Sequence, residues 1–196
     1  MATSGLTVAK EGNVSARVDA EQLIVITPHG IPYESMRIED LLAVDFSEHV
    51  VDGNLTPSLE TKLHLAIYRA RQDVGAVVHT HSTYATALSA LAEPIPPFLE
   101  EQIPHLGGEI KTARYGRSGT DELGRNVVDG LGDRHAVLVA SHGVVCCGKD
   151  LDLALSYAQR VERIAQIYLL ARNAGKIKQL PRKTIEDQKK IYKRSR

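Results

Sequence analysis

The sequence predicts an α/β fold: a single domain with a mixed central β-sheet flanked by helices. Three observations support this class. The chain has 196 residues, 43% of them hydrophobic, which suits one compact domain with a sizeable core. Short apolar runs typical of buried strands alternate with longer segments of helical periodicity. Because the alternation is irregular and includes hairpins, a mixed sheet is expected rather than a purely parallel one.

The first expected elements are a hairpin and a short strand. Residues 12–30 alternate polar and apolar side chains around a turn near Asp19 and Ala20, which predicts the hairpin. A short strand is expected around residues 42–46.

The first expected helix spans residues 56–72. Thr56 or Ser58 can cap its start, and Pro57 suits its first turn. Apolar side chains recur at helical spacing on one face, at Leu59, Leu63, Ala66, Ile67 and Ala70.

The remaining elements continue the same alternation. They are a buried strand at 76–79, a helix at 83–91, a Pro-rich break at 93–98, a loop and strand at 107–116, a capped helix at 120–131 ended by Gly132, a buried strand at 135–140 and a long helix at 151–174. No internal repeat or linker interrupts them, so we expect one domain over residues 1–196 with a helical tail at about 176–196.

The charges are unevenly distributed although the formal net charge is zero. Residues 172–196 hold ten Lys and Arg against Glu186 and Asp187, a net charge of +8, and the rest of the chain carries −8. A basic tail can bind nucleic acid or an anionic surface. The apolar positions in this tail (Ile185, Ile191 and Tyr192) fit a solvated terminal helix at least as well, so we expect no nucleic-acid partner.

The cysteines and the absence of long apolar runs bear on the compartment. The only two cysteines, Cys146 and Cys147, are neighbours and cannot link distant segments. The sequence has no apolar stretch long enough to span a bilayer and no start typical of a signal peptide. We therefore expect a cytoplasmic protein with no membrane partner.

Three histidines follow buried strands and are candidate metal ligands. His79 and His81 are one residue apart at the end of an apolar run, so both rings can lie on the same face of a strand. His142 follows the apolar run at 135–140. Strand ends in α/β sheets collect ligand sites, and three histidines with an open position are typical of catalytic zinc. Alone, a pair such as His79 and His81 is more often two polar residues at the rim of a sheet than a metal site.

Glu60 and His64 lie one turn apart in the helix expected at 56–72. The helix dipole favours a carboxylate in the first turn, so Glu60 either joins the site or serves only the helix start. His64 lies between Leu63 and Leu65, which favours a structural histidine over a ligand.

Six motifs in order carry a family resemblance. They are GNVSAR (12–17), ITPHGIPYE (26–34), PSLE with His64 and Tyr68 (57–68), VVHTHS (77–82), GG with YGRSGTDEL (107–123) and HGVVCCG followed by DLALSYAQRVERIAQIYL (142–169). Each motif is loose by itself, but their order is specific. The chain resembles the class II aldolase/adducin family from Gly5 to about Leu170.

The resemblance implies a three-layer fold, a homotetramer with sites at subunit interfaces, and one Zn²⁺ or another divalent metal per subunit. By matching positions, the metal ligands are His79, His81 and His142, and Glu60 is the proton-transfer group. That role calls for a carboxylate whose pKa is raised in a partly desolvated cleft. Glu100 stands where the family pattern has a tyrosine that donates a proton to the departing aldehyde.

The phosphate pocket that the resemblance implies is altered in this chain. Lys10 and Leu59 replace hydroxyl side chains, and His29 replaces a serine or threonine. Lys10 and His29 can substitute positive charge for the lost hydrogen bonds; alternatively, Lys10 points to solvent and the substrate differs. The matching positions that remain are Gly12, Asn13, Gly30 and Ser58.

The resemblance implies a lyase of carbohydrate metabolism: a zinc-dependent aldolase that cleaves a ketose phosphate or related polyol through a metal-stabilised enediolate. Alternatives on the same scaffold are a pentulose-phosphate 4-epimerase, a methylthioribulose-phosphate dehydratase and an oxo-acid phosphate decarboxylase. A non-catalytic adducin-like binding module is least expected, because such modules lack the metal histidines present here.

Overall fold

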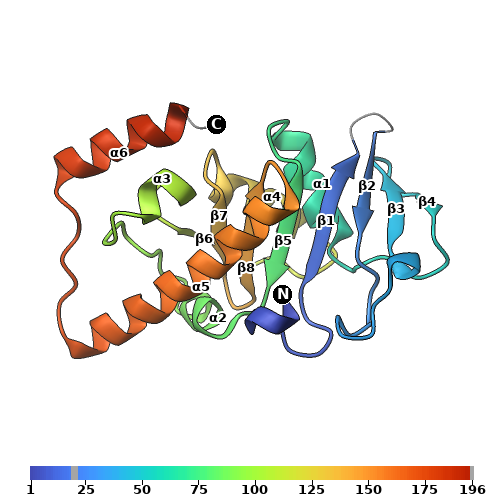
Figure 1. Cartoon of the computed structure of the whole chain (residues 1–196), viewed down its shortest axis with the longest axis horizontal. Helices are drawn as coiled ribbons and strands as arrows, with labels where there is room; N and C mark the ends of the chain where they lie inside the picture. The colour runs from blue at the N-terminus through green and yellow to red at the C-terminus, as the bar shows by residue number, and fades with distance from the viewer. Residues whose placement is uncertain (19–21, 195–196) are drawn as a thin grey trace.

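A mixed sheet forms the centre of the molecule. In the computed structural model, which describes residues 1–18 and 22–194, its eight strands follow the order β4-β3-β2-β1-β5-β8-β7-β6 (Figure 1). All neighbouring strands pair antiparallel except β6 and β7, which are parallel, so the predicted mixed sheet is confirmed. The strands are β1 (Asn13–Val18), β2 (Leu23–Ile26), β3 (Leu42–Asp45), β4 (Val50–Asp52), β5 (Ala76–Thr80), β6 (Lys111–Ala113), β7 (Ala136–Val139) and β8 (Gly143–Gly148).

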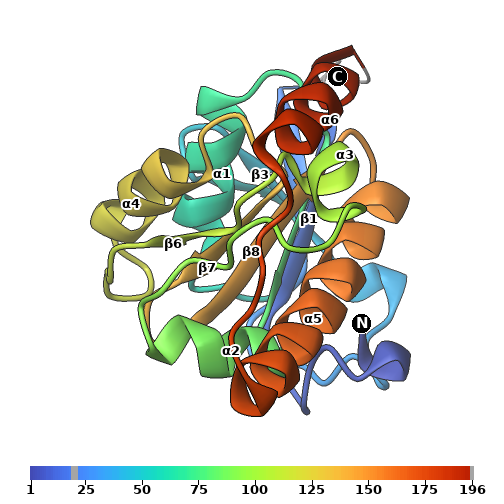
Figure 2. The same ribbon diagram turned by 90° about the vertical axis from the view of Figure 1, so that its left-hand side faces the viewer.

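Helices cover both faces of the sheet, which gives three layers (Figure 2). Val78 and Cys146 point into the core under α2 and α5, and their neighbours Val77 and Cys147 point into the core under α1 and α4. This alternation follows from the two-residue period of a strand. The helices are α1 (Thr61–Ala70), α2 (Thr83–Ala90), α3 (Gln102–Leu106), α4 (Asp121–Leu131), α5 (Leu151–Ala174) and α6 (Arg182–Arg194), with the short 3-10 helices η1 (Ala2–Ser4) and η3 (Ile38–Asp40).

Helix α1 begins later than the sequence predicts. Its N-cap is Glu60, and neither Thr56 nor Ser58 caps it. Pro57 instead forms an isolated antiparallel bridge with Pro28, and the Ser58 N–H donates to the Thr27 carbonyl. The bridge keeps Pro57 out of the helix, and residues 59–60 form a turn before α1, so the expectation of a helix from residue 56 is wrong.

Strand β8 has no counterpart among the predicted elements, which pass from the strand at 135–140 to the helix at 151–174. All six of its residues are buried, and it pairs with both β5 and β7. Strand β4 and helix α3 were not anticipated either. The predicted hairpin is present as β1 and β2, while Asp19 and Ala20, where its turn was expected, lie outside the described residues.

The basic tail is helical, but it is anchored on the domain. Helix α6 lies against α3 (Figure 1). The Tyr192 side chain is 3% exposed, and its hydroxyl donates to the Asp133 carbonyl at 2.7 Å. The expectation of a merely solvated helix is therefore wrong at this residue. Among the described residues, none of the helices has the length and apolarity needed to cross a membrane.

Candidate metal centre

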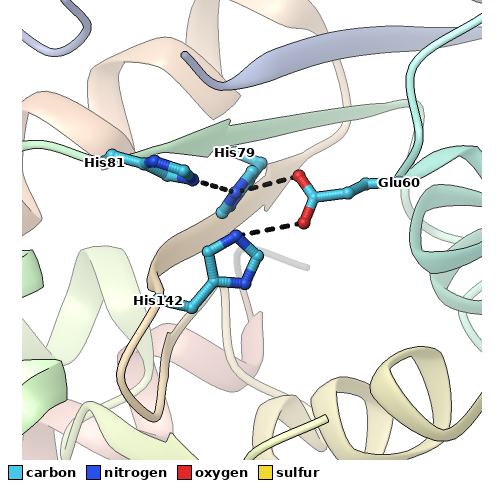
Figure 3. Close-up of side chains that lie close together, drawn as sticks. All are labelled: Glu60, His79, His81 and His142. Atoms are coloured by element: carbon cyan, nitrogen blue, oxygen red, sulfur yellow. Dashed lines mark hydrogen bonds and ion pairs between the residues drawn. The ribbon is translucent and has the colours of Figure 1, made fainter. Parts of the chain in front are cut away.

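Three histidine rings converge in the middle of the sheet, where β5 ends and β8 begins. His79 lies in β5, His81 follows that strand, and His142 lies in the turn between β7 and β8. Their ring centroids are 4.8 to 4.9 Å apart, and the Nε2 atoms of His79 and His81 are 3.0 Å apart. Figure 3 shows the rings facing a common point. Side chains 63 residues apart in sequence thus meet because β5 and β8 are neighbours in the sheet.

The backbone around the rings fixes their orientation. The Nδ1–H of His79 donates to the Val144 carbonyl at 2.9 Å, which leaves Nε2 facing the common point. Ser141 adopts a left-handed conformation (φ 54) that reverses the chain just before His142. A Cβ at Gly143 would lie 2.4 Å from the Thr80 carbonyl oxygen, so only glycine lets the turn approach β5 this closely.

The carboxylate of Glu60 faces the same point from the opposite side (Figure 3). Its Oε2 lies 3.1 Å from His79 Nε2, and its Oε1 lies 3.1 Å from His142 Nε2. The side chain is buried, and the Ser58 hydroxyl accepts the Glu60 N–H at 3.2 Å. One ligand atom from each of Glu60, His79, His81 and His142 lies within 4.8 Å of the others.

The site holds Glu60 in its ionised form. Burial alone would raise the pKa of the Glu60 carboxyl, but the charges of His79 and His142 and hydrogen bonds from His79 and Asn13 hold it well below its usual range. The expectation of a raised pKa is therefore wrong, because it counted desolvation without the facing imidazoles.

The two more exposed rings are held neutral. Burial, together with the charges of His79 and His142, lowers the pKa of His81 to about 4. Burial also lowers the pKa of His142. Burial lowers the pKa of His79, but the facing Glu60 and the hydrogen bond to the Val144 carbonyl raise it overall, so this ring must give up a proton when a metal binds. Three imidazole nitrogens with a carboxylate are a donor set that suits Zn²⁺. The described residues therefore fit a divalent cation.

A cavity of about 180 Å³ opens beside Glu60, His81 and His142. All six residues predicted for the phosphate pocket line it: Lys10, Gly12, Asn13, His29, Gly30 and Ser58. Ser118, which the sequence analysis did not single out, also lines it and donates to Glu60 Oε1 at 3.3 Å. The motif YGRSGTDEL contains this serine, but no spacing rule connects it to Glu60.

Two further residues lie behind Glu60. The side-chain amide of Asn13 donates to Glu60 Oε2 at 2.9 Å, so at least one polar group of Asn13 faces the carboxylate and not the cavity. His64 is fully buried and is not part of the metal cluster. Its position agrees with the expectation of a structural histidine, although its hydrogen bonds lead to the site.

Glu100 is not brought to this site within the chain. It lies in the exposed turn before α3, and its Oε1 accepts a hydrogen bond from Gln188 of α6 at 3.1 Å. It does not line the cavity beside Glu60. The resemblance assigned a role to Glu100 from its position in the sequence alone. Within a single chain, Glu100 does not contact the three histidines.

Comparisons with known proteins find a matching family model and similar sequences. Residues 1–169 match the family model described as the class II aldolase and adducin N-terminal domain. The chain is 34% identical over 192 residues to a 5-deoxy-D-ribulose 1-phosphate aldolase of Bacillus thuringiensis, a match that covers 98% of this chain and 90% of that protein. It is 39% identical over 170 residues to an L-fuculose phosphate aldolase of Escherichia coli K12, covering 86% of this chain and 77% of that one.

A solved structure is also similar. It is titled L-fuculose 1-phosphate aldolase and superposes with a TM-score of 0.93 at 36% identity, covering 97% of this chain and 90% of the other.

Proposed function

The chain belongs to the class II aldolase and adducin family, and we propose that it is a metal-dependent aldolase that cleaves a carbon–carbon bond of a ketose phosphate or related polyol. The observation that carries this proposal is the convergence of Glu60 with His79, His81 and His142 at a cavity. The similar aldolases named above act on five- and six-carbon ketose phosphates according to their names, which supports a sugar phosphate as substrate.

The metal that we propose is Zn²⁺, held by His79, His81 and His142. A donor set of three imidazoles with a nearby carboxylate supports this choice. When bound, such an ion supplies a Lewis acid for the negative charge that develops on the substrate oxygens.

The role we propose for Glu60 is proton transfer at carbon. Because its carboxyl is ionised, it is ready to accept the proton next to the substrate carbonyl in the condensation direction. The same carboxyl returns that proton to carbon in the cleavage direction. Ser118 and Asn13 each donate a hydrogen bond to it and hold its two oxygens in place.

The anionic end of the substrate is proposed to bind beside Lys10, His29, Gly30 and Ser58. These residues line one cavity together with Glu60. Lys10 adds a positive charge, and a charged donor to phosphate makes a stronger contact than a neutral hydroxyl.

We further propose a homotetramer whose active sites lie at subunit interfaces. In that assembly, Glu100 of a neighbouring subunit accepts the hydroxyl proton as the aldehyde departs and returns a proton to the aldehyde oxygen in the condensation direction. Glu100 of the same chain does not line the cavity. Light scattering tests the assembly: we expect four times the 21.4 kDa mass of one chain, and a monomer would contradict it.

A cytoplasmic location is proposed from the two free, buried cysteines.

The aldolase proposal is tested by incubating zinc-loaded protein with a panel of ketose 1-phosphates and their unphosphorylated analogues, with detection of the released aldehyde. We expect cleavage of at least one phosphorylated ketose. Epimerised or dehydrated product without aldehyde would instead favour another reaction of the same scaffold.

Two sets of variants test the assigned roles. Metal analysis of chelator-free preparations should find about one divalent ion per chain, and His79→Ala, His81→Ala and His142→Ala should each lose it.

Glu60→Gln should keep metal and fold but lose turnover by about 10²- to 10⁴-fold. A Glu60→Gln protein without metal would show that the carboxylate is chiefly a ligand.

A further inference from the structure

A row of buried polar side chains connects Glu60 to the interior of the domain. Asn13 Nδ2 donates to Glu60 Oε2 at 2.9 Å, Asn13 Oδ1 lies 2.6 Å from His64 Nε2, and His64 Nδ1 lies 2.6 Å from the Ser15 hydroxyl. All four side chains are buried, at 0 to 6% exposure. Only Glu60 and Asn13, at one end of the row, line the cavity, whereas His64 and Ser15 do not.

The spacing of the four residues within β1 and at the start of α1 brings their side chains together. Asn13 and Ser15 are two residues apart on β1 and share one face of that strand. Glu60 and His64 are four residues apart and share one face at the start of α1. Asn13 also stands directly opposite His79 in the pairing of β1 with β5, so the row meets the metal cluster at a fixed register.

The direction of each hydrogen bond follows from the orientation of the Asn13 amide. Its Nδ2 donates to Glu60 Oε2, and its Oδ1 faces His64 Nε2. That oxygen can only accept, so His64 carries its proton on Nε2. In a neutral ring Nδ1 is then an acceptor, and the Ser15 hydroxyl donates to it. Burial lowers the pKa of His64 to about 3, which keeps the ring neutral.

We propose that His64 is a positioning residue for the reaction: through Asn13 it holds the Glu60 carboxylate at the proton-transfer position. Without the Nε2–H donor, the Asn13 amide is free to turn its oxygen toward Glu60, which would repel the carboxylate from its place beside the histidines. The inference rests on the proposed role of Glu60 in proton transfer.

The first experiment compares three single variants with the parent, using the ketose 1-phosphate that the parent cleaves fastest. His64→Met removes the donor at similar volume, and we expect kcat to fall by about 10- to 100-fold, as for a displaced catalytic group, with KM and metal content unchanged. His64→Gln keeps an N–H donor that can reach Asn13, so it should recover most of kcat. Leu65→Ala, also buried in α1, should lower the unfolding temperature without lowering kcat.

A double-mutant cycle separates positioning from general destabilisation. If His64 acts through Asn13, then adding His64→Met to Asn13→Ala should cause no further loss of kcat. Independent, multiplying losses would overturn the inference, as would a His64→Met protein with parental kcat or a Leu65→Ala protein with an equal loss.

A measurement on the unaltered protein keeps the inference testable if His64→Met does not fold or the parent cleaves none of the ketose phosphates. Nitrogen NMR distinguishes a protonated from an unprotonated ring nitrogen. We expect His64 to carry its proton on Nε2 at neutral pH. The opposite tautomer, or a charged ring, would overturn the inference, whereas an inactive parent with the expected tautomer would count against the aldolase proposal alone.

Discussion

His64 makes the stability of the fold depend on pH. Burial, with a smaller contribution from the charge of His79, lowers the pKa of its imidazole from 6.5 to about 3. Between these values the unfolded chain binds a proton that the folded chain does not, so stability is fully present above about pH 6.5 and is lost as the pH falls toward 3. The slope is at most ~1.4 kcal/mol per pH unit for one proton.

Replacing His64 by Gln should therefore flatten the acid limb of the stability curve. Urea unfolding of parent and His64→Gln between pH 4 and pH 7 measures this directly, with the difference between the two proteins shrinking as the pH falls. Parallel curves would show that the ring is protonated in the folded state as readily as in the unfolded one.

Lys10 provides a second prediction at this scale. A hydrogen bond to a charged group is worth about 1.5 to 3 kcal/mol, and ~1.4 kcal/mol corresponds to one decade of affinity. Lys10→Ala should therefore raise KM for a phosphorylated substrate about 10- to 100-fold, with kcat little changed. Lys176→Ala, at an exposed position outside the cavity, is the control. Equal KM values for Lys10→Ala and parent, with no preference for phosphorylated over unphosphorylated ketoses, would contradict phosphate recognition by this lysine.

Some residues of the site could be predicted from the sequence and others could not. His79 and His81 are predictable because a strand places alternate residues on one face, and His142 because it follows another buried strand. The contact between Asn13 and Glu60 is not, because it joins residues 47 positions apart through the pairing of strands. The lowered pKa of Glu60 also depends on which groups face it, and that is a property of the folded chain.

Elements were predictable where periodicity is strong and local signals agree. Helix α5 was predicted at its observed bounds, and α4 begins with the expected Thr120 cap. Strand β8 was not predictable in this way, because its short apolar run lies directly between a turn and a helix start. There, periodicity alone does not distinguish a strand from a loop. The start of α1 was misplaced because the bridge between Pro28 and Pro57 outweighs the local capping signals.

The turn between β7 and β8 allows a test at this scale. A Cβ at Gly143 would meet the Thr80 carbonyl oxygen at 2.4 Å and the ring of His81 at 3.1 Å. Gly143→Ala should therefore separate β8 from β5 and move the histidines, with a loss of ~1 to 3 kcal/mol of stability from overpacking and weaker metal binding. Gly175→Ala, where a Cβ meets no atom within 4 Å, is the matched control. A Gly143→Ala protein with parental metal affinity would contradict a rigid turn.

Across the whole molecule, the two cores and the sheet between them determine where the site forms. The core under α2 and α5 and the core under α1 and α4 share the strands β5, β7 and β8. These strands are buried on both faces, so the residues that follow β5 and β7 are held at fixed positions. The overall class was predictable from composition and alternation, whereas the docking of the terminal helix was not, because its sequence is dominated by charge.

Helix α6 therefore provides the last prediction, since the aromatic ring of Tyr192 buries part of a strongly basic tail against the domain. Tyr192 is 3% exposed, its ring lies 5.2 Å from the ring of His135, and its hydroxyl donates to the Asp133 carbonyl. Its neighbour Ile191 is 51% exposed. Tyr192→Ala should lower the free energy of unfolding by about 3 kcal/mol, as for a buried aromatic side chain, and release α6 to proteolysis. Ile191→Ala should change it by no more than about 0.5 kcal/mol. Equal effects of the two substitutions in denaturant unfolding would show that the tail is held by its charges and not by the tyrosine.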